Sequence, residues 1–231
     1  MKWVNDFKHT YSFKDDCKHG RRLMMEWDKI LREKSYSKEE PEDIVVEFVS
    51  LLKNKKSKIL DLGCGAGRHL IYVEECGFEG YGADISRTGL NITKNRLRQR
   101  KLDCNLIRCH MNFLPYDKCS FDAVICINTL YHQKLEAMKR TIFEIYRILK
   151  SEGFLLTNFL TKRTYSYGKG KKVEENTFIR DEGVESGVLH HFIDKKEVEQ
   201  LFKNFTNYTL RLIEKEVNGK LSSRYVLIAK K

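Results

Sequence analysis

A glycine-rich segment between a short apolar run and a helical pattern constrains the fold of this chain most strongly. The segment reads ILDLGCGAGRHL over residues 59–70 and contains Gly63, Gly65 and Gly67. Glycines in a strand-to-helix turn let the backbone approach a ligand closely, and the helix behind them offers unpaired N–H groups. Ligands of open parallel sheets bind beyond the carboxyl ends of the strands, at such turns. The segment therefore predicts a ligand site after the first strand of a parallel sheet.

Short apolar strands and amphipathic helices alternate along the rest of the chain. Five successive strands are expected in KILDL, GYGAD, CNLIRC, FDAVICIN and GFLLTNFL. Helices lie between several of them, and Ser86 is the expected N-cap of one. Two final strands, in YTLRLIEKE and RYVLIAK, have no helix between them and are expected to pair as a hairpin. This order predicts an α/β fold with a Rossmann-like, doubly wound, seven-stranded and mostly parallel sheet that has an antiparallel C-terminal strand.

Two regions depart from this alternation. Residues 1–40 are polar, and the helical spacing of apolar residues in LMMEWDKILRE predicts a helical N-terminal cap. Residues 41–231 are expected to form the main domain, whose first helix begins around Pro41. Inside that domain, residues 161–191 show neither a strand nor a helix pattern, and long segments of this kind tend to be functional. We expect this insert to lie on the substrate side of the domain.

Composition narrows the class of protein. The chain has 231 residues, of which 41% are hydrophobic, enough for one globular core without staples. No apolar run is long enough for a signal peptide or a membrane span, so we expect a cytoplasmic protein. The seven cysteines are scattered without a CxxC pair, which predicts reduced thiols and no bound metal. A net charge of +11 fits either a polyanionic partner such as RNA or a solvated lysine-rich surface, and we favour the surface.

The end of the second strand indicates the type of ligand. Asp84 closes this strand 21 residues beyond Gly63, where its carboxylate can accept two hydrogen bonds from a ribose diol. The loop reads G-x-G-x-G, one residue shorter than the G-x-G-x-x-G of dinucleotide-binding folds, and the lysine of a P-loop is missing. The pattern therefore predicts an adenosine-type ligand other than a dinucleotide.

Four segments together resemble a known family. LDLGCGAGRH, YGADIS, NFLPYDKCSFDAVICINTLYH and EIYRILKSEGFLLTNF are similar, in order and spacing, to the motifs of class I S-adenosylmethionine-dependent methyltransferases. The resemblance covers about residues 41–160 closely, and the two final strands fit the family's closing hairpin. The segment from YGKGKK to LHHF looks like a subgroup of small bacterial and archaeal methyltransferases, mostly of unassigned substrate. The resemblance implies methyltransferase activity with S-adenosyl-L-methionine as cofactor.

The same resemblance implies roles for individual residues. The cofactor-binding set consists of Asp61, Gly63, Cys64, Gly65, Gly67, Arg68, Asp84, Ile85, Met111, Asn112 and Asn128. Within it, Asp84 matches the acid that binds the ribose hydroxyls, and Ile85 matches the apolar residue on the adenine face. Met111 and Asn112 match the segment at the adenine edge, and Asn128 matches the position near the cofactor amine and the transferred methyl group. His110 departs from the pattern, because many relatives carry an acid there that touches the adenine amine.

Methyl transfer makes modest demands on catalytic side chains. The reaction is an in-line displacement with a neutral leaving group, so positioning supplies most of the rate enhancement. A base is needed only when the acceptor carries a proton until attack. The candidates are Tyr131 and His132 after the fourth strand, and His191 at the end of the insert. His132 could instead cap or pad the next helix, and at most one of His190 and His191 would face the substrate, because neighbours in an extended segment point apart.

These observations favour a methyltransferase that acts on a small molecule under a lid. The lid would combine the cap, including Trp27 and Tyr36, with the insert, although helical spacing makes Trp27 more typical of core packing. Cationic and aromatic residues of the insert would favour an anionic or aromatic acceptor: Arg163, Tyr165, Tyr167, Lys169, Lys171 and Lys172. Arg68 could reach the methionine carboxylate or an anionic substrate, or lie on the surface. We expect a monomer or a homodimer.

Several alternatives stay open. An RNA (tRNA) methyltransferase would explain the net charge and the basic run over residues 94–101, but the segment after the fourth strand lacks the prolines of the (D/N)PP(Y/F) motif. A non-catalytic cofactor sensor or scaffold would keep the same fold, and a protein methyltransferase is a further alternative that the sequence leaves open. Arsenite methylation by converging thiolates would need Cys104, Cys109 and Cys119 together, and we favour core packing for them.

Overall fold

A computed structural model describes residues 24–33 and 38–231 of the chain. Most of the expected N-terminal cap, including Tyr36, lies outside the described residues. Residues 24–30 of the cap form a helix, as the spacing of apolar residues predicts. Its Asp28 carboxylate accepts hydrogen bonds from the Ser86 hydroxyl, at 2.6 Å, and from the Thr88 backbone N–H, at 2.8 Å. The cap helix is thereby attached to the start of a helix of the main domain.

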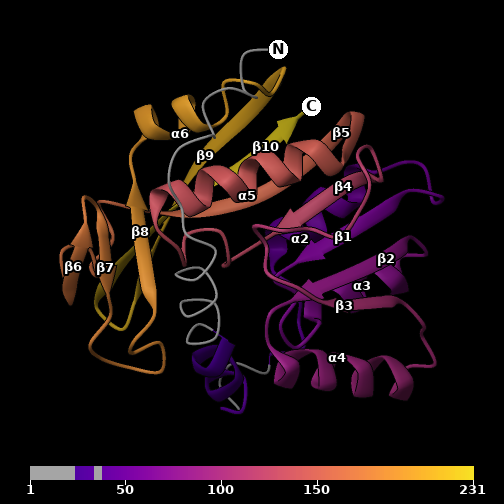
Figure 1. The fold of residues 1–231 in the computed structure, drawn as a ribbon, viewed down its shortest axis with the longest axis horizontal. Coiled ribbons are helices and arrows are strands. Elements are labelled where there is room, and N and C mark those ends of the chain that lie inside the picture. The colour runs from indigo at the N-terminus through magenta and orange to yellow at the C-terminus, as the bar shows by residue number, and fades with distance from the viewer. Residues whose placement is uncertain (1–23, 34–37) are drawn as a thin grey trace.

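The described part of the main domain contains one continuous sheet and five helices (Figure 1). The strands are β1 (Lys58–Leu62), β2 (Glu79–Asp84), β3 (Asn105–Arg108), β4 (Phe121–Cys126), β5 (Leu149–Thr161), β6 (Lys171–Glu174), β7 (Thr177–Ile179), β8 (Leu189–Ile193), β9 (Asn207–Val217) and β10 (Lys220–Lys230). The helices are α2 (Asp43–Leu51), α3 (Arg68–Glu75), α4 (Arg87–Gln99), α5 (Leu135–Ile148) and α6 (Lys195–Leu201).

The order of the strands confirms the Rossmann-like class. Strands β3, β2, β1, β4 and β5 are adjacent and parallel, β10 pairs antiparallel with β5, and β9 pairs antiparallel with β10. The chain reverses its direction of strand addition at β1, so the ends of β1 and β4 flank the switch point where such sheets bind ligands. The expected C-terminal hairpin is confirmed.

Helices cover both faces of the sheet because buried strands carry apolar residues on both sides. Ile59 and Leu60 are adjacent in β1 and belong to separate core clusters on opposite faces. One cluster packs against α5 through Met138 and Ile145, and the other packs against α2 through residues such as Phe48. Figure 1 shows α5 crossing one face of the sheet, with α2 and α3 behind it. Ser86 caps α4 as expected, accepting a hydrogen bond from the Gly89 N–H.

The expectation of an irregular insert is wrong. Strands β6, β7 and β8 form an antiparallel meander, and the end of β5 pairs in parallel with β8. The described residues therefore form a ten-stranded sheet, in which the seven expected strands are extended by three. Strand β8 reads LHHFI and is buried throughout, but its two histidines interrupt the apolar pattern that marks a buried strand. The aromatic rings of Tyr167, Phe178 and Phe192 pack edge to face and give the meander a small core.

The proline at the start of α2 is also placed differently from the expectation. Glu42 is the N-cap of α2, so Pro41 lies just before the helix and not in its first turn. Among the helices in the described ranges, none combines the length and apolarity that a membrane crossing requires.

Candidate active site

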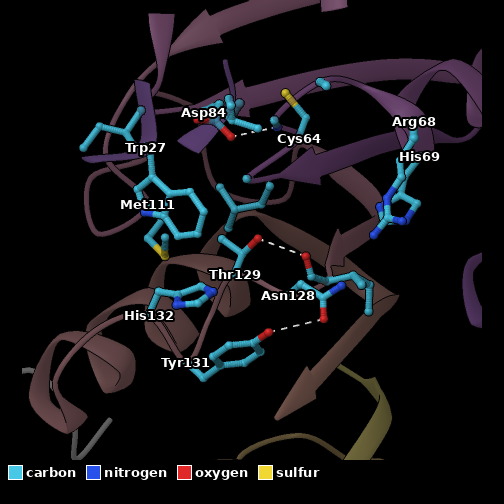
Figure 2. A pocket seen from close by; sticks show the side chains of 18 of the residues that line it. Trp27, Cys64, Arg68, His69, Asp84, Met111, Asn128, Thr129, Tyr131 and His132 are labelled. Carbon is cyan, nitrogen blue, oxygen red and sulfur yellow. Dashed lines mark hydrogen bonds between the residues drawn. The ribbon is translucent and has the colours of Figure 1, made fainter. Parts of the chain in front are cut away.

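A cavity of about 480 Å³ lies beyond the carboxyl ends of β1, β2 and β4. This volume is in the range of small-ligand sites. Its wall includes residues of the cap, the glycine loop, the end of β2, the turns after β3 and β4, and three more distant segments: Trp27, Leu31, Lys38, Glu42, Gly63, Cys64, Gly65, Arg68, His69, Asp84, Ile85, His110, Met111, Asn128, Thr129, Tyr131, His132, Glu185 and Arg224. Figure 2 shows the labelled members of this wall around one space.

The glycines of the loop are required for different reasons. Gly63 has φ +77°, and a Cβ there would lie 2.3–2.9 Å from side-chain atoms of Thr129. Gly67 has φ +82°, and its Cβ would lie 2.6–3.0 Å from the Thr93 side chain. Gly65 has φ +52°, but its Cβ would meet only Leu31, at 3.6 Å. Gly63 and Gly67 therefore allow close packing, whereas Gly65 leaves room at the cavity wall.

Asp84 connects the glycine loop to the start of α4. Its Oδ2 accepts a hydrogen bond from the Gly65 N–H at 2.8 Å, and its Oδ1 accepts one from the Ser86 N–H at 2.7 Å. Burial raises the pKa of Asp84, while these two N–H groups act in the opposite direction. A carboxylate oxygen has two lone pairs, so each oxygen can accept a further hydrogen bond from a ligand hydroxyl in the cavity.

Two buried polar side chains lie near the start of α3, Asp61 of β1 and His69 of α3 itself. Asp61 is not part of the cavity wall, and its Oδ2 accepts from the Leu70 N–H at 3.1 Å. Burial, with a contribution from the Asp84 carboxylate, raises the pKa of Asp61 to about 7. His69 lines the cavity and is 5% exposed, and burial lowers its pKa to about 3. Its Nε2 has no hydrogen-bond partner within the described part of the chain, so a neutral ring faces the site with one nitrogen available.

A hydrogen-bond network holds the end of β4. Asn128 has φ +56°, and its backbone N–H donates to Asn158 Oδ1 at 2.8 Å. Its Nδ2 donates to Glu42 Oε1 at 2.5 Å, and Arg224 Nη1 donates to its Oδ1 at 2.6 Å. Arg68 also donates to Glu42 Oε1, at 2.7 Å. Arg68 is therefore held within the site wall and does not lie free on the surface.

The candidate catalytic residues Tyr131 and His132 lie at the opposite end of the cavity from Asp84 (Figure 2). The Tyr131 hydroxyl donates to Asn128 Oδ1 at 3.3 Å, and burial raises the pKa of Tyr131. His132 is 2% exposed, and its ring contacts the edge of Trp27 at a centroid distance of 4.8 Å. Burial, with a contribution from His190, lowers the pKa of His132 to about 3. Near neutral pH His132 is thus an uncharged hydrogen-bonding group and a weak base.

Two expectations about catalytic or acceptor-binding residues are corrected by the structure, and one disfavoured alternative loses support. His191 is not part of the cavity wall, and its ring nitrogens contact Thr177 Oγ1 of β7 at 2.7 Å and Glu197 Oε1 of α6 at 3.0 Å. The cationic and aromatic residues of the insert lie outside the cavity wall, to which the insert contributes Glu185. The cysteine alternative also fails, since burial raises the pKa of Cys104 to about 12 and that of Cys109 to about 11.

Of the remaining residues predicted to bind the cofactor, some line the cavity and others lie behind its wall. Cys64, Ile85 and Met111 line the cavity together with His110. Asn112 lies outside the wall, where its Oδ1 accepts from the Thr141 hydroxyl at 2.6 Å. Sequence reasoning missed His69, Glu42, Glu185 and Arg224. His69 directly follows the glycine loop and could have been found, whereas the other three come from distant elements without a local motif.

Comparisons with known proteins agree with this geometry. Residues 59–153 match the family model described as a methyltransferase domain. An uncharacterized protein of Methanocaldococcus jannaschii is 34% identical over 148 residues, 55% of this chain and 60% of that protein. A tRNA (carboxymethyluridine(34)-5-O)-methyltransferase of Arabidopsis thaliana is 34% identical over 119 residues, 47% of this chain and 28% of that protein. The chain spans about half the length of the curated relatives it matches.

The fold is shared with solved structures at lower identity. The 1,6-didemethyltoxoflavin-N1-methyltransferase of Burkholderia thailandensis, solved with S-adenosylhomocysteine, superposes with a TM-score of 0.70 at 15% identity. The superposition covers 96% of this chain and 92% of that one. Together with the family match, these findings show that residues 59–153 are a methyltransferase domain and that the chain has the fold of class I S-adenosylmethionine-dependent methyltransferases.

Proposed function

We propose that this chain is an S-adenosylmethionine-dependent methyltransferase that transfers the methyl group to a small-molecule acceptor. The observation that carries the proposal is the single cavity formed by the glycine loop and Asp84 at one end and by Tyr131 and His132 at the other. Such a cavity can hold a nucleoside-bearing donor beside an acceptor. The methyltransferase family that residues 59–153 match supports S-adenosylmethionine as this donor.

The residues present fit this cofactor. Asp84 keeps acceptor capacity for the ribose hydroxyls, and Ile85 and Met111 supply apolar surface for the adenine. The unpartnered Nε2 of His69 is a buried polar atom at the cavity wall, of the kind that a ligand normally satisfies. The Glu42 and Arg68 pair offers groups of both charges to the amino-acid end. When bound, the cofactor supplies an electrophilic methyl group.

The protein's own contribution is positioning. The Asn128 network fixes the end of β4 with hydrogen bonds from three elements, so the groups beside the transferred methyl have little freedom. Holding two reactants in line can lower the barrier by roughly 7–11 kcal/mol. His132 and Tyr131 orient the acceptor by hydrogen bonds. Since His132 is uncharged and weakly basic, an acceptor with a readily lost proton fits this site best.

The acceptor end favours a small molecule over RNA. Trp27 and Leu31 of the cap, together with Glu185 of the insert, form part of the wall of a cavity of about 480 Å³, a volume in the range of small-ligand sites. The cap and the insert would therefore act as the lid over the acceptor. An RNA acceptor is the second candidate, because the net charge is +11 and relatives named as tRNA methyltransferases occur.

Calorimetry with S-adenosylmethionine tests the cofactor site first. Asp84→Ala removes the ribose acceptor and should weaken binding by about 1–3 kcal/mol, roughly 5- to 150-fold. Asp122→Ala is the matched control, because Asp122 also accepts a backbone N–H, from Lys58 at 2.8 Å, but is not part of the cavity wall. Equal affinity in wild type and Asp84→Ala would overturn the assignment.

A labelled-methyl assay tests the reaction and its acceptor. The protein is incubated with labelled cofactor and a metabolite extract or tRNA, and the labelled products are identified by mass spectrometry. We expect label in a small molecule. Label in tRNA alone would establish the RNA candidate, and cofactor binding without any labelled product would indicate a sensor or scaffold.

A further inference from the structure

Three side chains with metal-binding atoms gather where the insert returns to the cavity. They are His132 from the turn after β4, Glu185 from the turn between β7 and β8, and His190 from β8. One ligand-type atom of each lies within 4.8 Å of the others. His132 and Glu185 line the cavity, and the His190 ring packs against the His132 ring at a centroid distance of 4.7 Å. Of the three residues, methyl transfer as proposed above uses His132 alone.

The hydrogen bonds of the two histidines determine which nitrogens face the cluster. His132 Nδ1 lies 3.0 Å from the Leu189 carbonyl oxygen, and His190 Nδ1 lies 3.2 Å from the Val188 carbonyl oxygen. A carbonyl only accepts hydrogen bonds, so these contacts favour a proton on each Nδ1, and a ring with that proton alone presents the Nε2 lone pair. Histidines that bind metals are usually held in this way, with the other ring nitrogen donating to a carbonyl or carboxylate.

The contact between His190 and Glu185 needs a proton or a metal ion between its two atoms. His190 Nε2 lies 2.8 Å from Glu185 Oε2, and a carboxylate oxygen also only accepts. Two acceptors at this distance repel unless a proton or a metal ion lies between them. Arg180 donates to the same Glu185 oxygen at 2.9 Å and orients the carboxylate. One ring nitrogen of His132 lies within 4.8 Å of the ligand-type atoms of this pair.

We propose that His132, Glu185 and His190 bind a divalent transition-metal ion at the acceptor end of the cavity. Two imidazoles and one carboxylate form a donor set that suits Zn²⁺, Fe²⁺ or Co²⁺. Bonds of about 2.0–2.2 Å place neighbouring ligand atoms roughly 3–4 Å apart, so a small side-chain rotation closes the cluster around an ion. The sequence led us to expect no metal because it has no CxxC pair, but this donor set is assembled from segments that only the fold brings together.

The metal site also narrows the chemical class of the methyl acceptor. This step rests on the proposed function. Three protein ligands leave coordination positions open, and these positions face the cavity through His132 and Glu185. The ion would bind an acceptor that carries an oxygen donor, such as a hydroxyl or carboxylate, next to the methylated atom. The acceptor would thereby be positioned through the insert, and the cofactor through the glycine loop.

Metal binding is measured on tag-free full-length protein after dialysis against a chelator. Titration calorimetry with ZnCl₂ and absorption spectroscopy with CoCl₂ should give one ion per chain and visible bands of nitrogen and oxygen ligation. Glu185→Gln keeps the shape of the side chain and should weaken binding by at least about 100-fold, as should His190→Ala. His110→Ala should leave it unchanged, since His110 lines the same cavity outside the cluster.

The outcomes separate this proposal from the proposed function. Absence of Zn²⁺ and Co²⁺ binding, or equal metal affinity in Glu185→Gln and wild type, would overturn the metal site. Calorimetry with S-adenosylmethionine on the same samples reports the cofactor site independently. Intact cofactor binding without metal binding therefore removes the metal site alone, whereas metal binding without cofactor binding removes the methyltransferase proposal alone.

Discussion

The two ends of the cavity are built in different ways. At the cofactor end, Gly63, Gly65, Asp84 and Ile85 lie close together in the sequence. The backbone N–H groups of Gly65 and Ser86 hold the Asp84 carboxylate in place. At the acceptor end, the groups come from the cap, the β4 turn, the insert and β10, which Figure 1 shows as separate parts of the chain. The family match over residues 59–153 includes the first end and stops before the insert. Local motifs thus specify the end proposed to bind the donor, whereas long-range packing forms the end proposed to bind the acceptor.

The largest effect is expected at the packed glycine of the cofactor end. Gly63→Ala combines a positive φ with a Cβ that would overlap the Thr129 side chain. Backbone strain and overpacking together should lower the free energy of unfolding by about 3–5 kcal/mol and abolish cofactor binding. Urea unfolding and calorimetry with S-adenosylmethionine measure the two effects.

A glycine outside the site provides the matched control. Gly77 has φ +81° but nothing within 4 Å of its Cβ position, so Gly77→Ala carries the backbone strain alone. Gly77→Ala should lower the free energy of unfolding by about 1 kcal/mol and leave cofactor affinity unchanged. The double variant Gly63→Ala, Thr129→Ala should recover part of the lost stability. Equal losses for the two single variants would show that close packing is not what the cofactor end requires.

A smaller effect on stability is expected for the buried carboxyl group of Asp61, which lies beneath the glycine loop. The pKa of Asp61 is raised to about 7 in the folded chain, against about 3.9 when unfolded. The folded state therefore keeps a proton that the unfolded state releases, and the stability that Asp61 contributes falls as pH rises from about 4 to about 7. The side-chain amide of the Asp61→Asn variant does not titrate in this range, so its contribution stays constant.

The measurement compares unfolding free energies of wild type and Asp61→Asn across pH. The advantage of the variant should grow by about 4 kcal/mol between roughly pH 4 and pH 8, and should level off above pH 7. A pH-independent difference would mean that the carboxyl is ionised throughout. The cofactor end would then depend on a buried charge and not on a neutral hydrogen-bonded group.

The sequence predicts the cofactor end well because its determinants are local. KILDL coincides with β1, and Ser86 caps α4 as expected. The glycine pattern and the spacing to Asp84 reflect one turn and one adjacent strand, so they can be read from about 25 residues. Asp61 and Gly67 match the same motif but support the loop from below the cavity, a distinction that depends on which side each residue faces.

The acceptor end could not be predicted in the same way. Strand β8 is stabilised by pairing with β5 across about thirty residues, and its histidines hide it from an apolar pattern. Of the adjacent pair His190 and His191, the geometry brings His190 to Glu185 and turns His191 toward Thr177 and Glu197. A sequence shows that two neighbours point apart, but the side of the strand that faces the site follows only from the register.

The smallest effect is expected for the exposed cations of the insert, which test whether its surface contributes to recognition. Lys169, Lys171 and Lys172 are exposed, and Lys172 pairs with Glu175 at 2.7 Å. Exposed pairs of this kind contribute about 0–1 kcal/mol. The triple alanine variant should therefore change turnover of a small acceptor less than about twofold. The matched control replaces three exposed cations of the basic run, Lys94, Arg98 and Lys101, and should behave alike. If instead tRNA binds with a steep salt dependence, and loses affinity only when the insert is neutralised, then the outer surface of the insert and not the cavity would select the acceptor.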